Sequence, residues 1–203
     1  MIVVSAALKG GVGKTTTSVY LAALAASGRR SVTLVDADPQ ASAAEWIEYA
    51  ADERLLKVSV VEAPTERLLG KALDRAGADD VVVVDTPPAH ERLLNKALGK
   101  AHVVVIPTRV GGIEMSRVEA VLEVVPPETP TGLVVCSART YTRSYQDALG
   151  SWAESDITVW GTVPERVAIT AGPDGPLCPD GLEAYREVWR RAQSAARSSA
   201  GSR

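Results

Sequence analysis

A short segment near the start of the chain combines glycines, lysines and threonines in a spacing that suits phosphate binding. It reads Lys9-Gly10-Gly11-Val12-Gly13-Lys14-Thr15-Thr16-Thr17. Glycines let successive backbone N–H groups approach phosphate oxygens with no Cβ in the way, and a helix that begins here adds the positive end of its dipole. Lys14 would reach the β- and γ-phosphates of a nucleotide, and the Thr15 hydroxyl would be a ligand of the Mg²⁺ ion that bridges them. We therefore expect residues 10–16 to bind a nucleotide.

Two aspartates that end apolar runs could complete this site with a magnesium ion. Asp36 and Asp85 each follow such a run, and a carboxylate at the end of a buried strand needs a cation or hydrogen-bond donors. Mg²⁺ keeps much of its hydration shell, so we assign Thr15 directly, and both aspartates through coordinated water, to the magnesium site. Asp38 lies two residues further on, where it could orient a water molecule toward the γ-phosphorus. Because it precedes Pro39, it could equally form a helix-entry turn.

Short runs rich in valine and isoleucine alternate along the chain with segments of helical periodicity. Several runs are apolar at every position, as in strands buried on both faces, so helices must cover both sides of the sheet. This alternation predicts an α/β fold with a doubly wound, mostly parallel sheet, whose ligands bind at the carboxyl ends of the strands. The expected strands are Ile2–Val4, Ser31–Val35, Val58–Val61, Val81–Val84, Val103–Ile106, Leu133–Val135 and Ile157–Val159, and the expected helices are 14–27, 41–51, 65–76, 90–99, 113–125, 142–153 and 181–196.

Length and composition fit one folded domain and exclude several classes of protein. The chain has 203 residues, of which 46% are hydrophobic and 23% charged, as in an average globular protein. A net charge of −3 excludes a globally basic nucleic-acid binder, and 4% aromatic residues with no Phe disfavour a base-stacking surface. The spacing of Cys136 and Cys178 fits no CxxC motif, so we expect idle thiols in a reducing cytoplasm. Neither a membrane span nor a signal peptide is expected.

The loop departs from the strict P-loop pattern, and the departure points to a family. The strict pattern has a glycine five residues before Gly13, where this chain has Leu8. The sequence KGGVGKTT is the deviant Walker A motif, and about residues 1–170 resemble the ParA/MinD family of P-loop ATPases. Two further segments carry the resemblance: residues 35–40 (VDADPQ) with Ser42 and Trp46, which resemble small, ParF-like ParA proteins, and residues 81–88 (VVVVDTPP), which resemble the family's Walker B segment.

The resemblance implies a role for each candidate residue. It implies that ATP and Mg²⁺ are the cofactors, that the reaction turns ATP and water into ADP and phosphate, and that Asp38 is the hydrolytic aspartate. Lys14 already serves the phosphates of its own chain, and in the family the lysine at the position of Lys9 crosses a dimer interface to the partner's nucleotide. ATP would then be part of a homodimer interface that hydrolysis undoes. By position, Arg139 and Pro164 are expected in the base pocket.

The family has members with different cargoes, and the last helix narrows the choice. Large apolar residues end at Trp189, which leaves too little apolar area for the lipid-binding helix of MinD-like members. We therefore expect a cytoplasmic partition or positioning ATPase without membrane binding. Its ATP dimer would bind DNA nonspecifically, and so associate with the nucleoid, and a ParB-like or other cargo-bound protein would stimulate it. The candidate DNA contacts, which could equally be solvated charges, are Arg139, Arg143, Arg186, Arg190, Arg191 and Arg197.

One alternative function and the domain limits complete the expectations. A metabolic ATP-dependent enzyme resembling dethiobiotin synthetase shares the fold, but it would need a second substrate pocket. Because the first strand begins at residue 2, we expect no helix-turn-helix extension and no operator binding. Residues 1–193 are expected to form a single P-loop ATPase domain. The small, polar composition after Gln193 predicts a flexible tail over residues 194–203.

Overall fold

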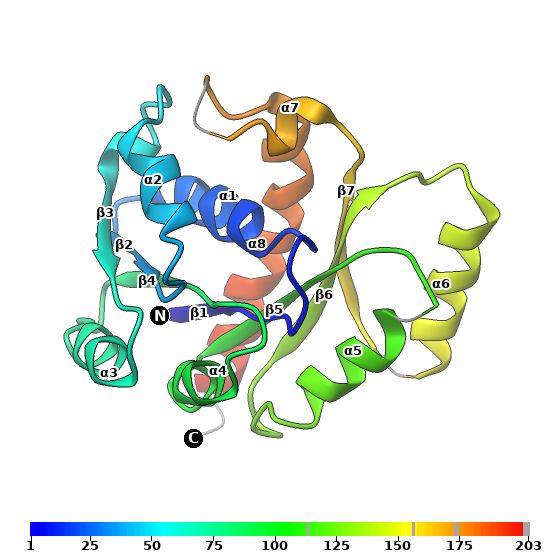
Figure 1. Cartoon of the computed structure of the whole chain (residues 1–203), viewed down its shortest axis with the longest axis horizontal. Helices are drawn as coiled ribbons and strands as arrows, with labels where there is room; N and C mark the ends of the chain where they lie inside the picture. Colours follow the sequence, from blue (N-terminus) through cyan, green and yellow to red (C-terminus); the bar gives the residue numbers. More distant parts are fainter. Residues whose placement is uncertain (113, 156, 173–174, 201–203) are drawn as a thin grey trace.

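The chain forms one parallel sheet with helices on both faces (Figure 1). The computed structural model describes residues 1–112, 114–155, 157–172 and 175–200. Within these residues, seven strands pair in parallel in the order β3-β2-β4-β1-β5-β6-β7. This confirms the predicted doubly wound α/β fold. The strands are β1 (Ile2–Ser5), β2 (Val32–Asp36), β3 (Val58–Glu62), β4 (Val81–Asp85), β5 (Val103–Thr108), β6 (Thr131–Ala138) and β7 (Val159–Pro164).

Two apolar layers, one on each face of the sheet, hold the helices in place. Successive strand residues point to opposite faces, so Val3 joins one cluster with Tyr20 and Tyr185, and Val4 joins the other with Leu93. The first layer carries α1 (Lys14–Ala26), α2 (Ser42–Glu48), α7 (Val167–Thr170) and α8 (Pro179–Ala200), and the second α3 (Glu66–Asp74), α4 (Glu91–Leu98), α5 (Glu114–Leu122) and α6 (Arg143–Glu154). None of the described helices is both long and apolar enough to cross a membrane.

The structure differs from the expected elements mainly in the last third of the chain. The last strand runs from Val159 to Pro164 instead of Ile157–Val159, and it contains Gly161, where a Cβ would lie 2.5 Å from Val188 of α8. The last helix runs from Pro179 through Ala200, beyond the expected end at residue 196, and Ala196 is buried. Two short helices, α7 and the 3-10 helix η1 (Leu55–Lys57), were not expected.

The order of the strands places one edge of the sheet where a ligand can bind. β1 lies between β4 and β5, so the chain adds strands first on one side of β1 and then on the other. Ligands of doubly wound folds bind outside the carboxyl ends of the strands at such a point. The register also pairs Ser5 with Asp85 and Asp85 with Asp36. The glycine loop and both candidate magnesium aspartates therefore meet at this edge.

The pairing of β6 with β7 depends on a glycine that lies under a tryptophan. A Cβ at Gly132 would lie 2.0 Å from the indole of Trp160, which is itself 6% exposed. The register of the two strands shifts between Leu133 and Val134, beside this contact. The indole thus covers bare backbone, and any side chain at Gly132 would displace it.

We predict that Gly132→Ala lowers the free energy of unfolding by about 1–3 kcal/mol, because the added methyl group overpacks a filled site. Urea denaturation of the purified protein measures this change. Gly150→Ala is the matched control, because Gly150 lies in α6 with no heavy atom within 4 Å of its Cβ position. That variant should keep or raise the stability, by up to about 1 kcal/mol. Equal stability of the two variants would contradict the proposed packing.

Candidate functional site

The loop between β1 and α1 takes a shape that requires its glycines. Gly11 and Gly13 have φ angles of 74° and 106°, in the left-handed region that favours glycine. No atom lies within 4 Å of a Cβ placed on Gly10 or Gly11, so their backbone faces open space. Gly13 caps α1 without any side-chain hydrogen bond, which leaves the first N–H groups of the helix free to bind an anion. The loop is therefore an open cradle of N–H donors.

Lys14 closes the loop from inside. Its Nζ donates a hydrogen bond of 2.8 Å to the backbone carbonyl of Lys9, and the side chain is nearly buried. Burial lowers the pKa of Lys14, and the charges of Asp85 and Asp38 oppose this effect in part. The ammonium group thus lies between the loop and the two carboxylates, where a phosphate group could bind it.

Asp85 connects the end of β4 to the first turns of α1. Thr15 Oγ1 donates to one carboxylate oxygen at 2.8 Å, and Ser18 Oγ donates to the other at 3.0 Å. The residue is 1% exposed, and burial raises the pKa of Asp85 to about 7, with the charge of Asp36 adding to the shift. Thr15 and Asp85, both assigned to magnesium from the sequence, are therefore in direct contact.

Asp36 has a different set of contacts. Its carboxylate accepts backbone hydrogen bonds from Asp38 at 3.0 Å and from Ala43 and Ala44 at 2.9 Å each. Burial raises the pKa of Asp36, and the three N–H donors oppose that shift. The contacts anchor the turn between β2 and the start of α2. Asp36 therefore positions Asp38, whose own carboxylate accepts the N–H of Gln40 at 2.9 Å and lines the cavity described below.

Lys9 points away from Lys14, toward α5. Its Nζ contacts Glu114 Oε1 at 2.8 Å, and Arg117 contacts the same oxygen at 3.0 Å. The Lys9 side chain is 46% exposed, whereas that of Glu114 is 9% exposed. Glu114 thus holds Lys9 at the edge of the molecule, away from the phosphate end of its own cavity.

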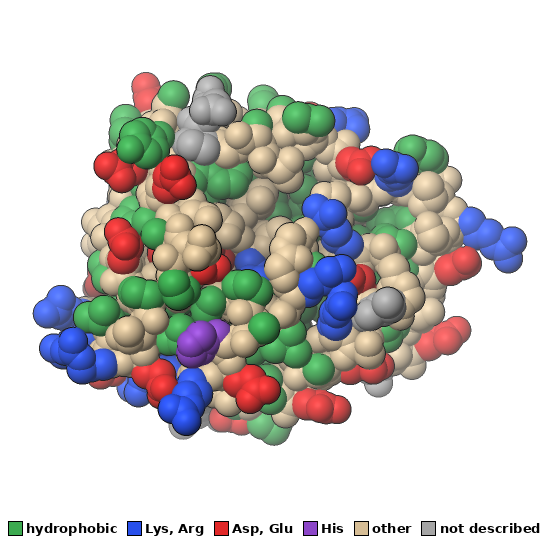
Figure 2. Space-filling view, in the orientation of Figure 1, with side chains coloured by type: hydrophobic (Ala, Val, Ile, Leu, Met, Phe, Trp, Pro, Cys, Tyr) green, Lys and Arg blue, Asp and Glu red, His purple; other side chains and the backbone are tan. Residues whose placement is uncertain are grey.

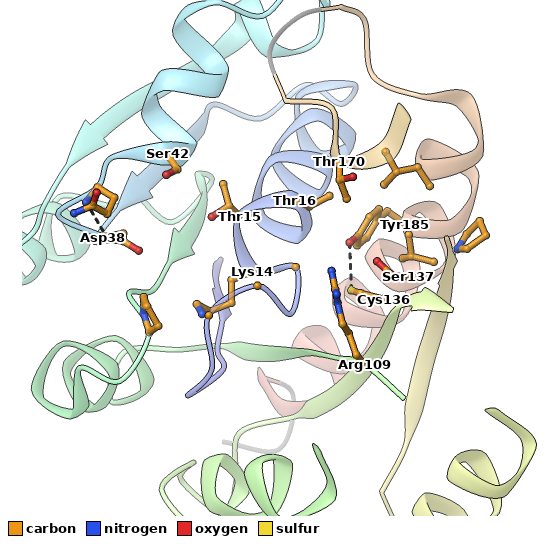
Figure 3. A pocket seen from close by; sticks show the side chains of 18 residues that line it. Lys14, Thr15, Thr16, Asp38, Ser42, Arg109, Cys136, Ser137, Thr170 and Tyr185 are labelled. Carbon is orange, nitrogen blue, oxygen red and sulfur yellow. Dashed lines mark hydrogen bonds between the residues drawn. The ribbon is translucent and has the colours of Figure 1, made fainter. Parts of the chain in front are cut away.

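A cavity of about 420 Å³ opens beside the loop (Figure 3). One end is polar and is formed by the glycine loop with Lys14, Thr15 and Asp38; the other is largely apolar and comes from β7, α7 and α8. A nucleotide has the same division, with charged phosphates at one end and a flat base at the other. The lining consists of Gly10, Gly11, Gly13, Lys14, Thr15, Thr16, Asp38, Gln40, Ser42, Pro88, Arg109, Cys136, Ser137, Val163, Pro164, Ile169, Thr170 and Tyr185.

The last helix reaches the wall of this cavity through Tyr185. Its hydroxyl is 2.9 Å from Thr17 Oγ1 and 3.7 Å from Cys136 Sγ, and its ring stacks on Tyr20 with centroids 5.0 Å apart. Burial raises the pKa of Tyr185 well above its usual value, so the hydroxyl stays protonated. The contact joins α8 to α1 directly behind the glycine loop, although the two helices are far apart in the sequence.

Two of the residues expected to bind the nucleotide lie away from the cavity. The side chain of Val12 is buried beside α5 and lines a separate, small gap. Arg139 forms two hydrogen bonds to Glu165, at 2.5 and 3.2 Å, with its side chain 61% exposed. Of the two residues expected in the base pocket, only Pro164 is among the described residues of the lining.

The cavity also includes residues that the sequence motifs did not indicate. Arg109 directly follows β5, and Ser137 lies at the carboxyl end of β6. The rule that ligands bind at the carboxyl ends of strands could therefore have indicated both residues. Ser137 has a φ of 50° at an irregular point of β6, which no sequence signal predicts. Tyr185 lies in a helix, where its periodicity resembles that of any core residue.

The residues present fit a magnesium ion that phosphates help to hold. Among the described residues, no group of three His, Cys, Asp or Glu side chains could hold a metal ion by itself. Thr15 and Asp85 do lie together beside the open cradle of Gly10 and Gly11. This donor set suits Mg²⁺, which binds through one or two protein oxygens together with water and phosphate oxygens.

Comparisons with known proteins agree with this geometry. Residues 3–175 match the family described as the CobQ/CobB/MinD/ParA nucleotide binding domain. A maintenance of carboxysome distribution protein A from Gloeobacter kilaueensis is 42% identical over 109 residues, which are 53% of this chain and 49% of that relative. The chromosome-partitioning ATPase Soj of Thermus thermophilus is 28% identical over 92% of this chain and 94% of its own length.

A solved structure of a related protein has the same fold. The septum site-determining protein MinD of Pyrococcus horikoshii, solved as a complex with Mg-ADP, superposes with a TM-score of 0.74 at 16% identity and covers 98% of each chain. The family match and the similarity to Soj confirm the predicted resemblance to ParA and MinD proteins. With a family match over most of its length and a glycine loop, lysine and aspartates gathered at one sheet edge, the chain belongs to the CobQ/CobB/MinD/ParA nucleotide-binding domain family.

Proposed function

We propose that this protein is a Mg²⁺-dependent ATPase that dimerises when it binds ATP and that partitions or positions a large cargo through nonspecific contact with DNA. One observation supports this above all. The cradle of Gly10–Thr16, the Lys14 ammonium and the Asp38 carboxylate surround a single cavity, whereas Lys9 is held outside it. The first group of residues suits one nucleotide, and Lys9 is left for a second.

The phosphate end of the cavity supplies the binding. The N–H groups of the loop and of the first turn of α1 would donate to phosphate oxygens, and Lys14 would exchange the carbonyl of Lys9 for the β- and γ-phosphates. Thr15 would hold Mg²⁺ directly, Asp85 and Asp36 would act through coordinated water, and the ion would neutralise phosphate charge. Burial of a phosphate anion beside the two carboxylates of Asp36 and Asp85 is favourable only with such a cation.

Asp38 is suited to orient the attacking water. It lines the cavity at the phosphate end, and Asp36 fixes the turn that carries it. One of its oxygens accepts the N–H of Gln40, which leaves the other able to accept a proton from water. We therefore propose that hydrolysis depends on Asp38.

Lys9 would act on the nucleotide of a second copy. In the single chain its Nζ pairs with Glu114, which Arg117 also contacts, and dimerisation would replace Glu114 by the partner's phosphates. Hydrolysis and phosphate release would remove that anion and return Lys9 to Glu114. The nucleotide would thus control the dimer.

The relatives suggest the kind of cargo, and the surface suggests where DNA binds. Soj is named for chromosome partitioning and the carboxysome protein for carboxysome distribution. Near the end of the chain, Arg190 and Arg191 are both paired with Glu187. Arg143, at the start of α6, is 94% exposed, and its ion pair with Asp147 is loose, with 3.7 Å between the two groups. Arg139, in the loop from β6 to α6, is likewise paired with Glu165, so we propose that Arg143 at the end of this loop contributes a DNA contact, while a ParB-like or other cargo-bound protein stimulates hydrolysis.

Lys14→Ala should weaken ATP binding by about 10- to 150-fold, the equivalent of about 1.5–3 kcal/mol for a hydrogen bond to a charged group. Titration calorimetry with ATP and Mg²⁺ measures the affinity, and circular dichroism checks that the variant is folded. Lys100→Ala is the matched control, because Lys100 is exposed and pairs only with Asp74 among the described residues. Wild-type affinity in Lys14→Ala would refute the nucleotide site.

Asp38→Ala should retain ATP binding but lower the rate of hydrolysis by about 10²- to 10⁴-fold, because the attacking water loses its positioning carboxylate. Release of phosphate measures turnover. Size-exclusion chromatography with ATP should show that the variant accumulates as a dimer. A variant that hydrolyses ATP at the wild-type rate would assign the role to another residue.

A gel shift on random duplex DNA tests the switch as a whole. The wild-type protein should shift DNA with ATP and not without it, and added salt should weaken the shift because phosphate contacts release counterions. Lys9→Ala should bind ATP as a monomer and fail to shift DNA, whereas Lys100→Ala should behave as wild type. ATP hydrolysis without any DNA shift or dimer would favour the alternative, a metabolic enzyme on the same fold.

A further inference from the structure

Arg109 brings a second cation into the cavity from the side opposite Asp38. It follows β5, the strand beside β1, and it lines the cavity. Figure 3 shows the side chain rising from the end of β5 toward the space between the glycine loop and the pair formed by Cys136 and Tyr185. The guanidinium group therefore lies between the polar and the apolar ends of the cavity.

The neighbouring charges agree with this position. The positive charge of Arg109 lowers the pKa of the Cys136 thiol, although burial raises it overall. It also lowers the pKa of Glu165, but both oxygens of that carboxylate are already bonded to Arg139. Among the described residues, Arg109 forms no ion pair and no side-chain hydrogen bond. A guanidinium group has five N–H donors and no acceptor, so its natural partner is an anion.

We propose that Arg109 binds the α-phosphate of the nucleotide, as a cationic contact separate from Lys14. The inference rests on the proposed nucleotide site. A nucleotide with its β- and γ-phosphates at Lys14 and its base among Val163, Pro164 and Ile169 has its α-phosphate and ribose in the middle of the cavity. This is where Arg109 points, and of those two groups only the phosphate is an anion.

The charges of the site support a second cation. The described residues that line the cavity include one carboxylate, that of Asp38, and two cations, Lys14 and Arg109. Lys9 lies outside the described lining, where its Nζ contacts Glu114 instead. Mg²⁺ and Lys14 would oppose the charge of the β- and γ-phosphates, but Asp38 in the lining and the adjacent Asp36 and Asp85 add negative charge. Arg109 would supply further positive charge at the phosphate that Lys14 does not reach.

The position makes a specific prediction about which nucleotides are affected. Arg109→Ala should weaken the binding of ADP and of ATP by the same factor, roughly tenfold, since both nucleotides carry an α-phosphate. AMP, measured by competition against bound ADP, should lose a similar factor. Arg109→Lys should bind with intermediate affinity because it keeps the charge and loses the planar fork. Arg92→Ala, which removes an arginine 83% exposed on α4, should bind as wild type.

Calorimetry with ADP and ATP separates the outcomes. Equal losses for both nucleotides in Arg109→Ala support the proposal. Unchanged affinity would overturn it, and so would a loss confined to ATP, which would place Arg109 at the γ-phosphate or at the partner's nucleotide. Failure of the nucleotide site itself has a different signature, because Lys14→Ala would then also bind as wild type. Since Arg109 is exposed, the variant should fold normally, which a thermal melt checks.

Discussion

The buried carboxylate of Asp85 is the contact on which the site depends. It ends β4 in the middle of the sheet, and it binds hydroxyl groups from the first and second turns of α1. Burial and the nearby charge of Asp36 both disfavour the ionised form, so the two hydroxyl donors offset a real cost. These two hydrogen bonds fix the start of α1 next to the end of β4. The loop between β1 and α1 must then turn within a few residues, and only glycines at Gly11 and Gly13 allow its positive φ angles.

The same arrangement explains why the edge would attract a polyphosphate with its cation. Asp36 and Asp85 are both fully buried and lie side by side in the sheet register, with the partly desolvated ammonium of Lys14 near Asp85. Like charges at short range favour a divalent cation, and the cradle of N–H groups favours an anion. Mg²⁺ bound together with phosphates satisfies both requirements at once. Glu114 keeps Lys9 out of this balance until another anion competes for it.

The apolar end of the cavity depends on contacts between distant parts of the chain. Tyr185 of the last helix forms a hydrogen bond with Thr17 and stacks on Tyr20. Gly181 leaves room for the ring of Tyr20, because a Cβ at that position would lie 2.6 Å from it. Tyrosine suits this place because its ring fills the core while its hydroxyl reaches a polar partner. The chain contains no Phe, and the largest fully buried aromatic rings of its core, Trp152, Tyr20 and Tyr185, all carry polar atoms.

The sequence by itself determined the parts of this protein that depend on neighbouring residues. Alternating apolar runs and helical periods predicted the doubly wound sheet, and the spacing from Lys9 to Thr17 predicted the loop, because hydrophobic patterning and backbone freedom are local properties of the sequence. The tertiary structure alone decided which distant groups meet. Asp36 bonds backbone N–H groups while Asp85 bonds Thr15, Lys9 pairs with Glu114, and Arg109 and Tyr185 complete the cavity. Such contacts arise from the order in which strands are added to the sheet and from the packing of α8, and no short motif encodes either.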